Sequence, residues 1–144
     1  MFLGRFDNKL DDKGRLAMPA KFRARLAEGF VVTRGFEPCL TVYPMSEWKK
    51  LTEALNRFPV TDQKARIIRR VLFAQACDTE LDKQGRILIP EYLREAAGLT
   101  SEVVVAGMDT YIEIWDKARW EEMERQSEEN AADIAQTLAD LGMM

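Results

Sequence analysis

The chain contains the same nine-residue motif twice. Segment 11–19, DDKGRLAMP, returns 71 positions later as segment 82–90, DKQGRILIP. The aspartate, glycine, arginine and proline are identical, and the apolar positions stay apolar. Two copies are too few for a solenoid, which needs about three or more repeats. The repetition therefore predicts a pseudo-twofold body, in which one chain imitates a symmetric dimer.

The composition is that of a soluble globular protein. Of the 144 residues, 47% are hydrophobic and 31% are charged, which excludes the low hydrophobicity of disordered chains. No apolar run approaches the roughly 18–20 residues of a membrane span, and the first residues lack the apolar stretch of a signal peptide. Cys39 and Cys77 stand alone, which indicates reduced thiols that serve packing. We expect a cytoplasmic protein that does not contact a membrane.

The charge is unevenly distributed along the chain. The net charge of −3 argues mildly against a nucleic-acid partner. However, residues 1–25 carry seven Lys or Arg against three Asp, whereas residues 108–144 carry three Lys or Arg against ten Asp or Glu. The field at a surface depends on charges within about 10 Å at ordinary salt. The pattern therefore predicts a basic N-terminal face and an acidic C-terminal segment.

Each copy of the motif opens a unit with the order β-β-α-β-β. Asp-Lys-Gly is typical of a turn, so the flanking residues are expected to form a hairpin. The proline that follows lacks an N–H, ends the second strand and opens a short helix. In the first unit we expect a helix at 20–26 and strands at 5–11, 15–18, 30–33 and 40–43. In the second we expect a helix at 90–98 and strands at 78–81, 86–89, 103–106 and 111–115.

Further helices connect and follow these units. Ser46 is placed to cap a helix at 47–57, and Thr61 or Asp62 is placed to cap a second one. A polar, acidic helix is expected over 117–141. We divide the chain into a first repeat with its helix (1–58), a linking helix (59–75), and a second repeat with an acidic C-terminal helix (76–144).

The residues best placed for recognition are the two arginines of the motif. Arg15 and Arg86 each follow an aspartate by four positions, Asp11 and Asp82, so the two side chains can meet across the mouth of the hairpin. Such a pair fixes the direction of the guanidinium. One interpretation is a structural salt bridge, although a surface pair contributes only about 0–1 kcal/mol. The other is that the arginine is presented to guanine O6 and N7 or to a phosphate.

Neighbouring turn residues complete the candidate site. Gly14 and Gly85 are expected to adopt the positive φ that the turn requires. Lys13 and Lys83 flank the arginines and are predicted to contact DNA because of their position in the turns. The second turn has Gln84 where the first has Lys13, so the two turns are not equivalent in charge.

Segments along the whole chain carry a resemblance to a known family. They are 1–6 (MFLGRF), 10–23 (LDDKGRLAMPAKFR), 32–35 (VTRG), 39–44 (CLTVYP) with 47–48 (EW), 80–86 (ELDKQGR) and 113–115 (EIW). With the doubled Asp-x-x-x-Arg motif and the acidic end, they resemble the MraZ family of bacterial transcription regulators. The resemblance implies an α+β fold, a double swapped-hairpin β-barrel of the AbrB type with flanking helices and a pseudo-twofold internal repeat.

The same resemblance implies a function and partners. Members of this family bind short, G-rich direct repeats in double-stranded DNA ahead of the division and cell-wall gene cluster, usually with repression, and assemble into closed rings. The family's signature positions correspond to Asp11, Arg15, Asp82 and Arg86. We expect a DNA-binding regulator on the nucleoid that forms a homo-oligomeric ring, with no cofactor, no metal and no small-molecule substrate.

Two other classes of function compete with this one. The chain has no histidine, so it lacks the usual general base and the commonest metal ligand, and we predict that it is not an enzyme. A ring-forming interaction scaffold or an antitoxin-type module that binds a protein partner remains the alternative. Four apolar residues are candidates for contacts within a ring or for burial inside the subunit: Trp48, Ile68, Leu72 and Trp120.

Overall fold

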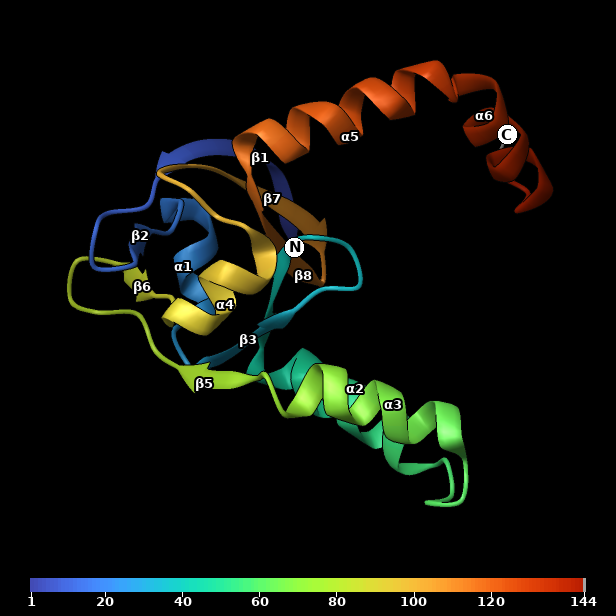
Figure 1. Cartoon of the computed structure of the whole chain (residues 1–144), viewed down its shortest axis with the longest axis horizontal. Coiled ribbons are helices and arrows are strands. Elements are labelled where there is room, and N and C mark those ends of the chain that lie inside the picture. The colour runs from blue at the N-terminus through green and yellow to red at the C-terminus, as the bar shows by residue number, and fades with distance from the viewer. Residues whose placement is uncertain (144) are drawn as a thin grey trace.

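A computed structural model describes residues 1–143 (Figure 1). Both repeats have the predicted order β-β-α-β-β. The first consists of β1 (Phe2–Lys9), β2 (Arg15–Ala17), α1 (Ala20–Leu26), β3 (Phe30–Arg34) and β4 (Leu40–Pro44). The second consists of β5 (Cys77–Thr79), β6 (Arg86–Leu88), α4 (Glu91–Ala97), β7 (Glu102–Asp109) and β8 (Tyr111–Asp116).

The strand order shows the predicted pseudo-twofold arrangement. The large sheet has the order β1-β7-β8-β4-β3-β5. Exchanging each strand with its counterpart in the other repeat gives the same order read in reverse, as a twofold axis requires. The first strand of each repeat pairs with the third strand of the other, β1 with β7 and β5 with β3. The two fourth strands meet in the middle, with Thr41 opposite Glu113. The two repeats therefore share one sheet.

The second strands form a separate two-stranded sheet. β2 pairs antiparallel with β6, and Leu16 lies directly opposite Ile87 at the centre of symmetry. The expectation of a hairpin ladder between 5–11 and 15–18 is wrong. Within residues 1–143 the Leu10–Leu16 bridge and two single hydrogen bonds, from the Asp11 N–H to the Arg15 carbonyl and from the Asn8 amide to the Ala17 carbonyl, join these two segments. Within residues 1–143 the ladders form an open six-stranded sheet beside this two-stranded one, and they do not trace a closed barrel.

Two short helices fill the space between the sheets. α1 buries Phe22 and Leu26, and α4 buries Leu93 and Ala97. These side chains share one core cluster with the inward residues of both sheets, among them Leu16 and Ile87. Ten buried residues of the cluster belong to the first repeat and eight to the second. Each repeat therefore leaves its apolar face uncovered unless the other is present.

Two helical arms extend from this body. α2 (Met45–Asn56) and α3 (Gln63–Phe73) form a helical hairpin, and α5 (Lys117–Glu129) leads into α6 (Ala131–Asp140). Figure 1 shows both arms on the side of the body away from β2 and β6. None of the helices within residues 1–143 combines the length and the apolar character needed to cross a membrane.

Three details of the arms bear on the predictions. Asp62 caps α3 as predicted, because its carboxylate accepts a hydrogen bond of 3.1 Å from the N–H of Ala65. Ser46 does not cap α2, which begins at Met45, two residues earlier than predicted and directly after Pro44. The C-terminal helix is not continuous: it breaks at Asn130, whose side-chain amide donates to the Gln126 carbonyl. Asparagine favours such local bonds to the backbone over a helical conformation.

The apolar candidates for contacts between subunits differ in exposure. Leu72 and Trp120 are buried, at 2% and 9% exposed. Trp120 packs against Trp115, and the half-buried Trp48 packs against Phe73. For Leu72 and Trp120 the structure therefore supports burial within the subunit. The apolar side chains that the arms expose are others: Phe58, Val60, Ile67, Ile134 and Leu141.

Gly14→Ala is expected to destabilise the fold strongly. A Cβ at Gly14 would lie 2.7 Å from the Ile89 carbonyl oxygen, and the φ of +84° is left-handed. A left-handed conformation alone costs an L-residue about 1–2 kcal/mol, and the contact with backbone adds to this. We expect the free energy of unfolding, measured by urea denaturation, to fall by more than about 2 kcal/mol.

Gly142→Ala is the matched control for this variant. Gly142 has a φ of +75°, but no atom lies within 4 Å of its added Cβ. This variant should lose at most the about 1–2 kcal/mol of unfolding free energy that a left-handed backbone conformation costs an L-residue. Equal losses in the two variants would contradict the close approach of the two repeats at Gly14.

Candidate nucleic-acid interface

The turns that precede β2 and β6 are built alike. In the first, Asp11 Oδ1 accepts hydrogen bonds from the backbone N–H groups of Lys13 (3.0 Å) and Arg15 (2.8 Å). Asp11 Oδ2 accepts the Nε–H of Arg15 at 2.7 Å. In the second, Asp82 accepts from Gln84 N, Arg86 N and Arg86 Nε, each at 2.9 Å. The predicted ion pair across each hairpin mouth is therefore present.

Each aspartate closes its turn and also orients its arginine. The three donors stabilise the charged form of the carboxylate. The backbone N–H of Arg15, followed by its side chain, lowers the pKa of Asp11 to about 2. The corresponding bonds from Arg86 lower the pKa of Asp82. Both carboxylates are thus ionised at neutral pH and hold the guanidinium by its Nε edge.

The strand register brings the two arginines to one surface. Leu16 and Ile87 point into the core and are fully buried, so their neighbours in β2 and β6 point outward. Arg15 lies opposite Leu88, two positions from Arg86. The two arginines are therefore diagonal neighbours on the outer face, with backbone positions about 7–8 Å apart. Their side chains are 34% and 30% exposed.

The guanidinium groups are held at one edge and open at the other. Only Nε of Arg15 and of Arg86 makes a side-chain hydrogen bond within residues 1–143. Nη1 and Nη2 of each group are thus left for an external acceptor. Two donors in one plane match the paired acceptors of a guanine edge or of a phosphate.

The two turns also depend on each other. The N–H of Ile89 donates to the carbonyl of Gly14 at 2.8 Å, and the N–H of Met18 donates to the carbonyl of Gly85 at 3.0 Å. Both glycines have positive φ, +84° and +74°. The end of each second strand therefore supports the turn of the other repeat.

Two arginines that the sequence analysis did not assign to the site lie against these turns. A Cβ added to Gly14 would meet Arg94 Nε at 2.9 Å, and one added to Gly85 would meet Arg23 Nε at 2.5 Å. Arg23 belongs to α1 and Arg94 to α4, so each covers the turn of the other repeat. The sequence contains a signal for them, because Phe22-Arg23 and Leu93-Arg94 also recur at the 71-residue offset.

The predicted lysines occupy different turn positions. Lys13 and Lys83 are both exposed. Lys13 N–H bonds to Asp11 Oδ1, whereas in the second turn Gln84 N–H makes the corresponding bond. Lys83 therefore occupies the position that Asp12 has in the first turn. The two turns match in backbone but differ in where their lysine charge lies.

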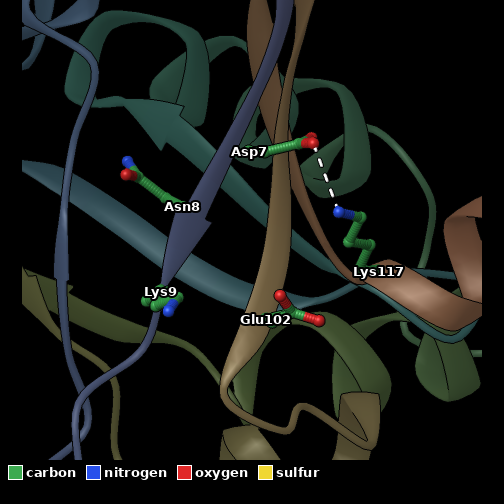
Figure 2. A pocket seen from close by; sticks show the side chains of 5 residues that line it. All are labelled: Asp7, Asn8, Lys9, Glu102 and Lys117. Carbon is green, nitrogen blue, oxygen red and sulfur yellow. Dashed lines mark ion pairs between the residues drawn. The ribbon is translucent and has the colours of Figure 1, made fainter.

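A surface hollow and a buried thiol are further features of the structure. A hollow of about 400 Å³ lies between β1, β7 and α5, lined by Asp7, Asn8, Lys9, Glu102 and Lys117. Figure 2 shows Lys117 reaching Asp7, at 3.6 Å, with Lys9 and Glu102 nearby. Opposite charges balance there, as in a solvated surface cluster. Residues 1–143 contain no group of three side chains suited to a metal ion, and burial raises the pKa of the Cys39 thiol, which makes it inert.

The Asp11 ion pair predicts a pH dependence of stability. The pKa of Asp11 is about 2 in the folded protein and about 3.9 in an unfolded chain. The ionised carboxylate therefore stabilises the fold fully above about pH 4, and this contribution is lost as the pH falls towards 2. Urea midpoints should show wild type more stable than Asp11→Asn at neutral pH, with the difference closing between pH 4 and pH 2. A difference that stays constant over this range would contradict the assignment.

Comparison with known proteins places the chain in a family. A family profile described as "MraZ protein, putative antitoxin-like" matches residues 1–71 and again 72–141. A protein named Transcriptional regulator MraZ from Pediococcus pentosaceus is 49% identical over 143 residues, which are 99% of this chain and the whole of the relative. Proteins of the same name from Herpetosiphon aurantiacus and Roseiflexus castenholzii are 48% and 45% identical, over 99% and 98% of this chain and 100% and 99% of theirs. The chain therefore belongs to the MraZ family, whose named relatives are transcriptional regulators.

Proposed function

We propose that this protein is a transcriptional regulator that binds specific sequences in double-stranded DNA through the outer face of β2 and β6. One observation supports this above all: Arg15 and Arg86 lie side by side on that face, each held at Nε by an aspartate and open at Nη1 and Nη2. Stability alone is a weak reason for two such pairs, because an exposed pair contributes only about 0–1 kcal/mol. We assign the protein a binding function and no catalysis.

The proposed contacts divide into base recognition and positioning. Arg15 and Arg86 recognise guanine through O6 and N7 in the major groove. Lys13 and Lys83, exposed beside them, contact phosphates. Asp11, Asp82, Gly14 and Gly85 hold the turns in shape.

The proposal includes an AbrB-type body and a division of the chain into three units. The exchange of first strands between the repeats supports a swapped-hairpin body of the AbrB type. We keep the division into 1–58, 59–75 and 76–144; its last residue, Met144, lies outside the described residues. The first and third units form the site together, because β2 comes from the first repeat and β6 from the second.

Binding to tandem sites would require several copies of the protein. We propose a ring-shaped homo-oligomer that binds short, G-rich direct repeats upstream of the division and cell-wall genes, acting as a repressor at the nucleoid in the cytoplasm. Two turns on one subunit offer few contacts, and several subunits would bind repeats by avidity. Support comes from the arms: α3 carries Lys64, Arg66, Arg69 and Arg70 without an acidic residue, whereas α5 and α6 are mainly acidic. Exposed apolar groups on both arms, such as Val60 and Leu141, could meet in such a contact.

A second candidate function is an antitoxin-type or scaffold module that binds a protein. The observation in its favour is α6, which has no buried residue within the subunit and exposes Ile134 at 44%. An isolated helix of this length is marginal in water, so it gains from a partner. Co-purification of a small basic protein with the full chain, together with no DNA binding, would favour this alternative.

Loss of both arginines should abolish specific DNA binding. We expect Arg15→Ala to weaken binding by about 1–3 kcal/mol for each lost base contact, multiplied across subunits, and the Arg15→Ala, Arg86→Ala double variant to give no specific shift. The measurement is an electrophoretic shift with the protein's own upstream DNA, beside circular dichroism to verify folding. The control is Arg34→Ala, which removes one exposed charge from the end of β3. Normal binding by the double variant would refute the site.

Binding should also weaken steeply with salt. Each phosphate contact releases condensed counterions, so the logarithm of the binding constant falls by about 0.9 per contact for each tenfold rise in salt. Fluorescence anisotropy between about 50 and 200 mM salt should show a marked loss. A flat response would contradict a contribution from phosphate contacts.

A further inference from the structure

The Asp11–Arg15 and Asp82–Arg86 ion pairs do not make the outer face of β2 and β6 positively charged. An Asp–Arg pair is neutral as a unit, so the pairs formed by Arg15 and Arg86 direct hydrogen bonds but add no net positive charge to the face. DNA carries one negative charge per about 1.7 Å of helix axis, and attraction to it depends on uncompensated cations. Cations without a carboxylate partner must therefore supply the attraction; Lys13 and Lys83 are two of them, and two arginines beside the turns are others.

Arg23 and Arg94 have this property. Within residues 1–143, neither forms a salt bridge with a carboxylate, in contrast to Arg15 and Arg86. Each is instead anchored by one neutral bond, from Arg23 Nε to the Met18 carbonyl (2.9 Å) and from Arg94 Nε to the Ile89 carbonyl (3.0 Å). These bonds hold the guanidinium without cancelling its charge. Both side chains are half-buried, so their direction is restricted.

The position of each guanidinium follows from the exchange between the repeats. Arg94 Nε and Cζ would lie 2.9 and 3.0 Å from a Cβ on Gly14, the residue before Arg15. Arg23 Nε and Cζ would both lie 2.5 Å from a Cβ on Gly85, the residue before Arg86. Because a glycine has no side chain, the guanidinium can lie across the turn. Ile89, which anchors Arg94, also donates to the Gly14 carbonyl, so anchor and turn form one unit.

We propose that each DNA-contacting unit is composite, with a turn from one repeat and a helix arginine from the other. Arg94 acts with Arg15, and Arg23 acts with Arg86. The turn arginine, held by its aspartate, recognises a base. The helix arginine, fixed at Nε and uncompensated, binds the adjacent phosphate diester through its Nη atoms. This inference rests on the proposed function and adds to it a second pair of contact residues and their pairing across the repeats.

The pairing predicts which residues are coupled energetically. Residues that contact each other, or act on one ligand group, show non-additive effects, whereas distant ones add. Arg94 should therefore couple to Arg15, which is 79 positions away, and not to Arg86 in its own repeat. Arg23 should couple to Arg86 and not to Arg15.

The test is a pair of double-mutant cycles on the full chain with a labelled duplex of its own upstream DNA. We expect Arg94→Ala to raise Kd about tenfold or more, since it removes hydrogen bonds to a charged phosphate group. It should also lower the salt slope by about 0.9 for each lost contact, a change that a purely structural role would not produce. Combined with Arg15→Ala the effects should be non-additive, and combined with Arg86→Ala they should add.

Further variants make the outcomes distinguishable. Arg94→Lys keeps the charge and should keep most of the salt slope, so it remains informative if Arg94→Ala folds poorly. Amide exchange of Ile89 without DNA, followed in each variant, reports whether the turn itself is disturbed. Arg34→Ala, at the exposed end of β3, should leave both the cycles and the exchange unchanged.

Each result supports or overturns a specific statement. If wild type does not bind the duplex, the proposed function fails. If wild type binds and Arg15→Ala weakens it, but Arg94→Ala leaves Kd and slope unchanged, the composite unit alone is overturned. Coupling of Arg94 to Arg86 instead of Arg15 would overturn the pairing across the repeats.

Discussion

The structure depends on the exchange of backbone hydrogen bonds between the two repeats at Gly14 and Gly85. Each glycine carbonyl accepts an N–H from the strand end of the other repeat, and β2 forms its ladder with β6. This contact places Leu16 and Ile87 opposite each other in neighbouring strands, with both side chains in the core. It also turns Arg15 and Arg86 outward together. If the repeats separated, the core and the arginine surface would be lost at once.

The four arginines on this surface carry different chemical properties. Arg15 and Arg86 are bracketed by carboxylates that stay ionised, so their direction is fixed and their charge is compensated. Arg23 and Arg94 are bonded to neutral carbonyls and keep their charge. Direction suits the recognition of a base edge, and free charge suits attraction to a phosphate. The net charge of −3 for the whole chain conceals this local arrangement, because α5 and α6 alone carry seven acidic residues against three basic ones.

Much of the fold could be predicted from local patterns. The helix at 20–26, the order β-β-α-β-β and the Asp62 cap follow from turn residues, prolines and periodicity, and the structure confirms them. Strand partners could not be predicted in this way. The hairpin pattern predicted pairing of β1 with β2, whereas β1 pairs with β7, over 90 residues away in the chain. The break at Asn130 was also missed. There the side-chain amide donates to the Gln126 carbonyl, a local bond that the helical periodicity does not reveal.

The sequence by itself determined the repetition, the two turns and the four residues of their ion pairs, because each aspartate reaches its arginine within a single turn. Tertiary structure alone decided which turn lies beside which helix. Arg94 is in the second repeat by sequence and beside the first turn in space, since the glycine carbonyls bond across the twofold. Local spacing carries no information about such a contact. The turn of one repeat meets the helix of the other because the two repeats must pack together to bury their shared core.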